Sequence, residues 1–180
     1  MRKIIVAEFI SLDGVVESPE KWHFPYVDQE MMGIIGGSAA RSDTLLLGRV
    51  TYENFAGAFA NTPDDDPVGA MMNRPTKVVV SKTLTELSWR NSVLLSGDVE
   101  TAVKELKEQP GGDILTTGST TLVRTLLRAG LVDQLDLLVH PIVVGQGERL
   151  FEADGPTVPL ALVECTTLGT GVTHQVYRPA

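Results

Sequence analysis

The stretch Ile114-Leu115-Thr116-Thr117-Gly118-Ser119-Thr120-Thr121-Leu122-Val123-Arg124-Thr125-Leu126-Leu127 decides the fold of this chain. An apolar run meets a glycine, hydroxyl residues follow, and leucines then recur at helical spacing, which predicts a strand, a tight turn and a helix. Such a junction presents free backbone N–H groups and the positive end of a helix dipole, so it can bind an anion. Gly118 has no Cβ, so a phosphate can approach the backbone closely there. The same residues could also serve only as a helix cap, and the motif by itself leaves both interpretations open.

Length and charge limit the classes of function that this chain can have. Its 180 residues suffice for a full hydrophobic core, and we expect a single domain over residues 1–180. The net charge of −8 disfavours binding to nucleic acid, because the phosphates would be repelled. An anionic cofactor would therefore need a local cationic pocket. Cys165 is the only cysteine, which excludes an internal disulfide and a cysteine-rich zinc site.

Membrane and metal partners are also disfavoured. The apolar run at the N-terminus is too short for a signal peptide, and no later segment is long and apolar enough to span a bilayer. We therefore expect a cytoplasmic protein. The acidic cluster Asp64-Asp65-Asp66 falls in a predicted long loop, Ala56 to Pro75, where consecutive carboxylates indicate a solvated turn rather than a metal site.

Strand-like and helix-like segments alternate along most of the chain. The predicted strands begin with Lys3 to Ile10, and the predicted helices begin with Asp28 to Arg41. At the C-terminal end, Leu160 to Leu168 and Val172 to Tyr177 flank a glycine-containing turn, which predicts an antiparallel hairpin. The pattern predicts an α/β sandwich with a mixed, mostly parallel sheet, helices on both faces and a C-terminal antiparallel hairpin.

Three predicted strands end in turns that carry glycine, hydroxyl or basic residues. These turns are Gly48-Arg49, Ser81-Lys82 and Gly118-Ser119-Thr120-Thr121. The carboxyl ends of parallel strands lie on one edge of a sheet, where open α/β folds bind ligands. We therefore expect the three turns to meet and to form an anion site. Arg49 could be a solvated residue at a helix start, yet a cation beside free N–H donors suits a phosphate.

Candidate substrate residues lie in other turns and loops. Asp13, in Ser11-Leu12-Asp13-Gly14, is the first candidate for a polar substrate contact or a proton relay, and it could equally be a plain turn aspartate. Trp22 belongs to an aromatic-rich loop, which could plug the core or wall a ligand pocket. Tyr52 is a further candidate for a pocket wall. Gly145 suggests backbone passing close to a ligand or another chain, or simply a turn.

The order of these motifs resembles that of dihydrofolate reductases. The resemblance rests on Leu46 to Glu53, then Val79 to Lys82, then Thr117 to Leu122. The nearer match is the reductase domain of the bacterial riboflavin-biosynthesis deaminase/reductase, with its small stand-alone relatives. Ser11 to Gly14 and the Pro141 to Gly147 segment fit that branch, and the resemblance covers essentially the whole chain.

The resemblance implies a dihydrofolate reductase-like fold that binds NADPH across the strand ends. Gly48, Arg49 and Thr51 would then lie near the diphosphate and adenosine side, and Ser81 and Lys82 would face the adenosine 2′-phosphate. The diphosphate would be held by Gly118, Ser119, Thr120, Thr121 and Leu122. The chain departs from dihydrofolate reductases in two respects. Those enzymes usually show paired glycines where this chain has Gly118-Ser119. The folate-binding acid also has no secure counterpart, since Asp28 and Glu30 are wrongly spaced from Gly48.

The sequence and the resemblance together predict hydride transfer from NADPH to a C=N or C=O bond of a small heterocyclic substrate, such as a pyrimidine or pterin. The cofactor supplies the chemistry, and the fold aligns it with the acceptor. His23 could donate a proton or be a surface residue, whereas His140 and His174 are interpreted as structural. Two alternatives stay open: a non-catalytic nucleotide- or flavin-binding module, and an interaction protein whose glycine turns serve packing alone. A homodimer is the expected assembly.

Overall fold

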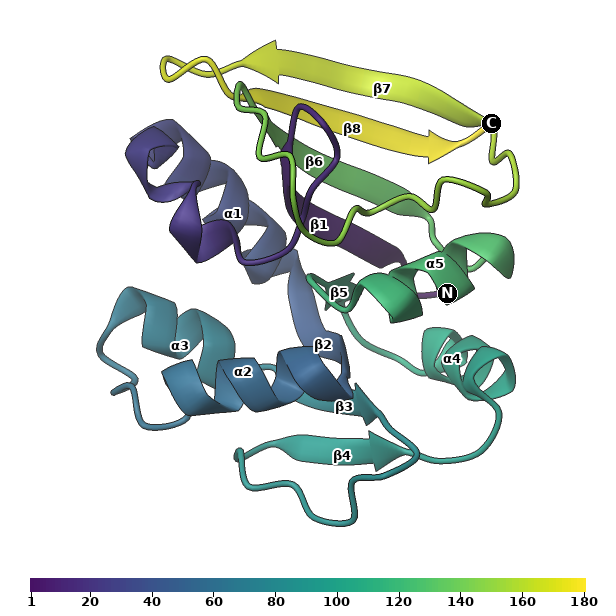
Figure 1. Cartoon of the computed structure of the whole chain (residues 1–180). Coiled ribbons are helices and arrows are strands. Elements are labelled where there is room, and N and C mark those ends of the chain that lie inside the picture. The colour runs from purple at the N-terminus through teal and green to yellow at the C-terminus, as the bar shows by residue number, and fades with distance from the viewer.

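The computed structural model describes residues 1–180, and its centre is one eight-stranded sheet with the strand order β4-β3-β2-β5-β1-β6-β8-β7 (Figure 1). The strands from β4 to β6 are parallel, and β8 and β7 close one edge as an antiparallel pair. Their bounds are β1 Ile4–Ser11, β2 Ser42–Gly48, β3 Thr76–Val80, β4 Ser92–Leu95, β5 Asp113–Thr116, β6 Gln134–His140, β7 Leu160–Thr167 and β8 Thr173–Pro179. The predicted fold class is therefore confirmed.

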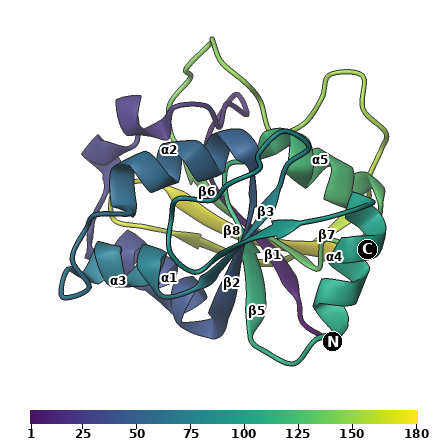
Figure 2. The same cartoon turned by 90° about the horizontal axis from the view of Figure 1, so that it is seen from below.

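Five α-helices cover the two faces of the sheet. Helices α1 to α3 lie on one side and α4 and α5 on the other, with the twisted sheet between them (Figure 2). Their bounds are α1 Gln29–Arg41, α2 Arg49–Phe59, α3 Pro67–Asn73, α4 Val99–Glu108 and α5 Thr120–Arg128, and two 3-10 turns span Pro19–Lys21 and Phe24–Tyr26. No helix is long and apolar enough to cross a membrane.

Side chains point to the two faces of the sheet in turn along each strand, and this explains why a separate hydrophobic core lies on each face. In β2, Leu46 faces α4 and α5, while its neighbours Leu45 and Leu47 face α2 and α3. The helix α5 buries Val123 and Leu126 against the first of these faces. Because both faces are covered, consecutive residues within a parallel strand are apolar, as in Leu45 to Leu47 of β2 and Val78 to Val80 of β3.

The prediction of a long loop from Ala56 to Pro75 is wrong. Helix α2 continues to Phe59, and residues 67–73 form α3. The Asp66 side chain accepts a hydrogen bond from the Gly69 N–H at 2.8 Å and so caps α3, while Pro67 occupies the first helical position. Asp64 pairs with Arg90, so two of the three clustered carboxylates have structural roles.

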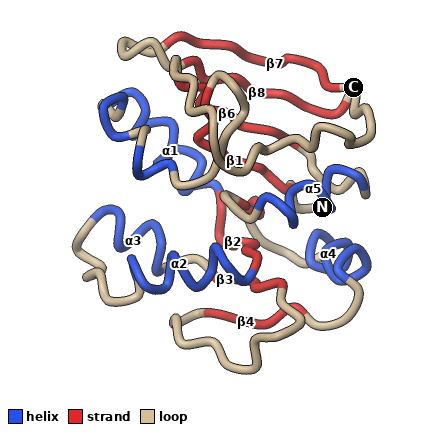
Figure 3. The backbone as a smooth tube through the Cα atoms, viewed as in Figure 1, coloured by secondary structure: helices blue, strands red, loops and turns tan.

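The segment between β6 and β7, residues 141–159, contains neither helix nor strand apart from one isolated bridge (Figure 3). That bridge joins Arg149 to Val15, just after β1. The segment is thereby held against the turn that follows β1, at the carboxyl edge of the parallel strands.

Candidate functional site

The three predicted turns lie along one edge of the sheet. β2 is the neighbour of both β3 and β5, and all three strands run in the same direction. Gly48, at the end of β2, pairs in register with Val80, the residue before Ser81. The turn from β5 into α5 contacts Gly48 directly. The sheet thus brings together Gly48 and Ser119, which are 71 residues apart in the sequence, as the alternation of strands and helices predicted.

Hydrogen bonds lock the turn after β2 to the turn after β5. The Gly48 N–H donates to the Ser119 hydroxyl at 2.9 Å, and the Ser119 N–H donates to the Thr51 hydroxyl at 2.8 Å. The Ser119 side chain therefore serves the neighbouring turn and makes no capping hydrogen bond to α5, although Ser119 is the residue at the cap position. The two turns form one rigid unit.

The backbone at Gly118 and Ser119 is held in an uncommon conformation. Both residues are left-handed, with φ of 60° and 48°. A Cβ on Gly118 would come within 3.1 Å of two side-chain atoms of Thr51, so only glycine fits without a shift. A left-handed serine is unfavourable, and its persistence here shows that the surrounding hydrogen bonds determine the turn.

Backbone donors remain available at the start of α5. The first helical hydrogen bond of this element runs from the Val123 N–H to the Ser119 carbonyl. The N–H groups of Thr120, Thr121 and Leu122 precede it and have no partner within the helix. With the helix dipole they form a site suited to an anion. The predicted diphosphate-binding residues thus divide into two that hold the turn, Gly118 and Ser119, and three with free N–H groups.

The cations of the predicted site are exposed. The Arg49 side chain pairs with Glu53, four residues later in α2, at 2.9 Å, and both are about half exposed. Lys82 is exposed and takes part in no ion pair. The Ser81 hydroxyl accepts hydrogen bonds from the Thr83 and Leu84 N–H groups, so it shapes the turn that carries Lys82. Both cations can therefore reach an anion at this edge without first leaving a buried pair.

Asp13 fastens the residue 141–149 segment to the end of β1. Its carboxylate accepts hydrogen bonds from the Ser11 hydroxyl at 2.7 Å and from the Val144 and Gly145 N–H groups at 3.0 and 2.9 Å. Arg149 adds an ion pair at 3.4 Å. The hydrogen bonds from Ser11, Val144 and Gly145, the one from Ser11 first, lower the pKa of Asp13 to about 2. Asp13 is an ionised acceptor, so it has no proton to donate at neutral pH.

The aromatic loop packs over the end of β6. Trp22 is buried, and its ring meets His140 edge to face with the centroids 5.1 Å apart. The His23 ring stacks on Phe9 at 4.5 Å. Burial lowers the pKa of His140 and of His23, so both imidazoles are neutral at neutral pH. This arrangement matches the interpretation of Trp22 as a core plug and gives His23 no proton to release as an acid.

Tyr52 lies in the core, not on the edge. Only 2% of the residue is exposed, and its hydroxyl accepts a hydrogen bond from the Trp89 N–H at 2.9 Å. The side chain therefore has no surface from which to contact a substrate. It points inward from α2 while Thr51, the residue before it, points toward Ser119.

Glu8 is a site residue that the sequence-based prediction missed. It lies in β1 and is 5% exposed, and one carboxyl oxygen accepts a hydrogen bond from the Gly118 N–H at 3.0 Å. The other oxygen is buried and has no partner. The available signal was a carboxyl group in the middle of an otherwise apolar strand, since such a group rarely lies in a core without a role.

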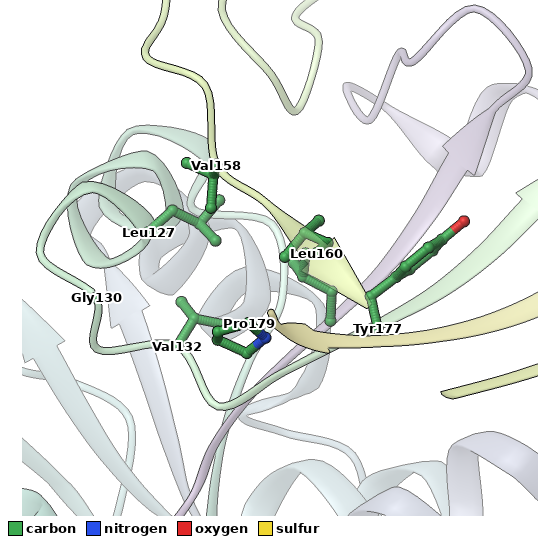
Figure 4. A pocket seen from close by; sticks show the side chains of 8 residues that line it. Leu127, Gly130, Val132, Val158, Leu160, Tyr177 and Pro179 are labelled. Carbon is green, nitrogen blue, oxygen red and sulfur yellow. The ribbon is translucent and has the colours of Figure 1, made fainter. Parts of the chain in front are cut away.

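Two hollows lie away from this edge. An apolar one of about 60 Å³ is lined by Leu127, Val132 and Leu160 among others (Figure 4), and it is far smaller than a cofactor pocket. A polar groove of about 350 Å³ lies between α1 and the β8 side of the sheet. On its floor His174 is hydrogen-bonded to the buried Asp136, which raises the pKa of His174. Neither hollow includes a residue of the three turns.

The fold defines a class of protein: an α/β domain with a dihydrofolate reductase-like fold, in which three strand ends meet at one edge of the sheet. Residues 2–174 match the RibD C-terminal domain family, and the chain belongs to that family. Among curated proteins, it is 28% identical to the uncharacterised protein YyaP of Bacillus subtilis (strain 168), over 98% of this chain and 95% of that protein.

Solved structures share the fold. A putative riboflavin biosynthesis protein from Shewanella sp. PV-4 superposes with a TM-score of 0.78 at 20% identity, covering 99% of both chains. A pyrimidine reductase-like protein from Corynebacterium diphtheriae gives a TM-score of 0.62 at 13% identity, covering 99% of this chain and 92% of that one. RibD from Acinetobacter baumannii gives 0.64 at 17% identity, and this chain, covered completely, spans 58% of it.

Proposed function

We propose that this chain is an NADPH-dependent reductase that transfers a hydride to a C=N or C=O bond of a small heterocyclic substrate, such as a pyrimidine or a pterin. Membership of the RibD C-terminal domain family supports a reductase-type role connected with riboflavin biosynthesis. The observation that carries the proposal is the lock between Gly48, Thr51 and Ser119, because it fixes the free N–H groups of α5 beside two exposed cations.

The residues at this edge fit a dinucleotide phosphate. The N–H groups of Thr120 and Thr121 would hold the diphosphate, and the exposed Arg49 and Lys82 would neutralise phosphate charge. A second cation near the adenosine end would favour NADPH over NADH. When bound, the cofactor supplies the hydride, and the rigid turns of this chain would orient it and exclude water from the reacting atoms.

One observation favours the alternative, a non-catalytic nucleotide- or flavin-binding module of the same fold. A reductase acting on a C=N or C=O bond needs a proton as well as a hydride. Asp13 is ionised and fully hydrogen-bonded, and His23 and His140 are neutral. In a catalytic protein these three side chains would not supply the proton, and Asp13 would serve to hold the 141–149 segment in place.

NADPH oxidation assayed against pterins, flavins and pyrimidine–ribose compounds separates the two functions. We expect turnover with at least one heterocyclic acceptor, and tight NADPH binding without turnover would favour the module. Lys82→Ala should weaken NADPH binding and leave NADH binding nearly unchanged, because only NADPH carries the 2′-phosphate. Lys104→Ala, an exposed lysine on α4, is the matched control. Equal loss for both cofactors would contradict the role of Lys82.

We also propose that the protein is a homodimer. Strand β7 is an unpaired sheet edge, and Leu162 and Val163 on it are 56% and 51% exposed. Long exposed apolar edges are uncommon in monomers, because they pair with other chains. Light scattering should give twice the mass of 19.4 kDa, and Leu162→Asp should shift it toward the monomer. A monomeric wild-type protein at micromolar concentration would contradict the proposal.

A further inference from the structure

The function proposed above does not yet explain the buried carboxyl group of Glu8. It projects from β1 on the face covered by α4 and α5, the same face as Val6 and Ile10. One oxygen accepts the Gly118 N–H, and the other is enclosed without a partner. Burying an acid so incompletely bonded destabilises the fold, so its presence needs a reason other than stability.

The reason lies in the turn that Glu8 holds. The Gly118 and Ser119 N–H groups are each fixed by a side chain from another element, Glu8 from β1 and Thr51 from α2. Gly118 and Ser119 both have a left-handed backbone conformation. Helix α5, whose first N–H groups are free, begins directly after them. We propose that Glu8 positions the Gly118–Ser119 turn so that the start of α5 can bind the diphosphate of a dinucleotide. This inference rests on the proposed function.

Glu8 acts through Gly118 and not by contact, because its unpartnered oxygen is enclosed and its other oxygen is bonded to the Gly118 N–H. It is therefore a positioning residue. Its charge matters all the same, because an ionised carboxylate beneath the start of α5 would repel an arriving diphosphate. Burial raises the pKa of Glu8 well above its ordinary value, and the Gly118 N–H opposes this only in part. The group is neutral over a wider range of pH than an exposed glutamate.

The ionisable side chains on the elements packed around Glu8 face away from it or are paired with other groups. Asp136 and His140 of β6 face α1, whereas Glu8 faces α5. The ionisable groups of α5 are engaged elsewhere, since Arg124 donates to the Leu150 carbonyl and Arg128 pairs with Glu152. On the neighbouring turns Arg49 pairs with Glu53, and Asp113 lies at the opposite end of β5.

Three variants test the proposal: Glu8→Gln, Glu8→Leu and the control Glu105→Gln, an exposed glutamate on α4. NADPH dissociation constants are measured by fluorescence from pH 6 to 9, and melting temperatures are measured without ligand. Glu8→Gln keeps an acceptor for the Gly118 N–H but cannot ionise. We expect it to bind NADPH within about twofold of the wild type at pH 6, and to lose less affinity than the wild type toward pH 9. The control should follow the wild type throughout.

Glu8→Leu removes the acceptor and also the buried polar group. We expect it to keep or raise the melting temperature while weakening NADPH binding about tenfold. A purely structural glutamate would give the reverse: a lower melting temperature with unchanged NADPH affinity in the leucine variant, and unchanged affinity overturns the inference. If the wild-type protein itself binds no NADPH, the proposed function fails first and the inference falls with it.

Discussion

Replacing the buried Lys77 by methionine should stabilise the protein at neutral pH, and the gain should shrink as the pH rises. Lys77 is 0% exposed, its ammonium group donates to the Asn73 carbonyl at 3.0 Å, and it lies 4.5 Å from the centre of the Trp89 ring. Burial, with a smaller contribution from Arg90, lowers the pKa of Lys77 to about 8. Holding a charge here therefore costs the folded state more than the unfolded one.

The two pKa values give the size of the effect. The ordinary value is 10.5 and the folded value is about 8. At about 1.4 kcal/mol per pH unit, the cost of the buried charge approaches about 3 kcal/mol below pH 8. Between pH 8 and 10.5 the unfolded chain binds more protons than the folded one, so stability rises with pH in that window. The Asn73 carbonyl keeps a second donor, the Asn91 side chain at 3.1 Å, so Lys77→Met leaves it satisfied.

Urea unfolding of the wild type and Lys77→Met at pH 7 and pH 10 isolates this residue, because all other ionisable groups are common to both proteins. We expect the free-energy difference between the two proteins to change by about 2 kcal/mol between these pH values, in favour of the wild type at high pH. A difference that stays constant with pH would show that Lys77 does not titrate as its burial implies, and would refute the reasoning.

Three further predictions concern the edge and the core. Gly118→Ala should lower stability by about 1–2 kcal/mol, because alanine disfavours φ of +60° and its Cβ would meet Thr51; a melting temperature equal to that of the wild type would contradict this. Tyr52→Phe should lower the free energy of unfolding by about 1–3 kcal/mol, because the buried Trp89 N–H loses its acceptor, and should leave NADPH affinity unchanged. A larger effect on binding than on stability would indicate that Tyr52 lines the ligand pocket. Asp13→Asn should remove a stabilisation that the wild type shows above pH 3.8 and loses as the pH falls toward 2, and melting curves from pH 2 to 5 should therefore converge at the acid end.

The sheet and its helices could be predicted from the sequence because local patterns determine them. The helix expected over Asp28 to Arg41 is α1, which Asp28 caps, and the hairpin expected at the C-terminal end is the pair β7 and β8. The α3 helix was missed because prolines and aspartates suggested a loop. Asp66 followed by Pro67 is, however, a helix start, and only packing against α2 and the sheet makes so short a helix stable.

The details of the site could not be predicted, because they depend on contacts between distant residues. Glu8 and Gly118 are 110 positions apart, and Thr51 and Ser119 are 68 apart. The pairing of side chains with N–H groups depends on strand register and on helix position. Neither can be read from the spacing of residues in the sequence. The same limit explains why Tyr52 was predicted to line a pocket. Which side chains of α2 face the sheet depends on the residue at which the helix begins, and the sequence did not fix that residue.

The central claim is that the three strand ends form one dinucleotide cradle, and titrating NADPH into 15N-labelled protein tests it most directly. The predicted result is that amide resonances of residues 48–51, 81–82 and 118–122 shift together with one dissociation constant. Shifts confined to the groove between α1 and β8, or none at millimolar NADPH, would contradict the claim.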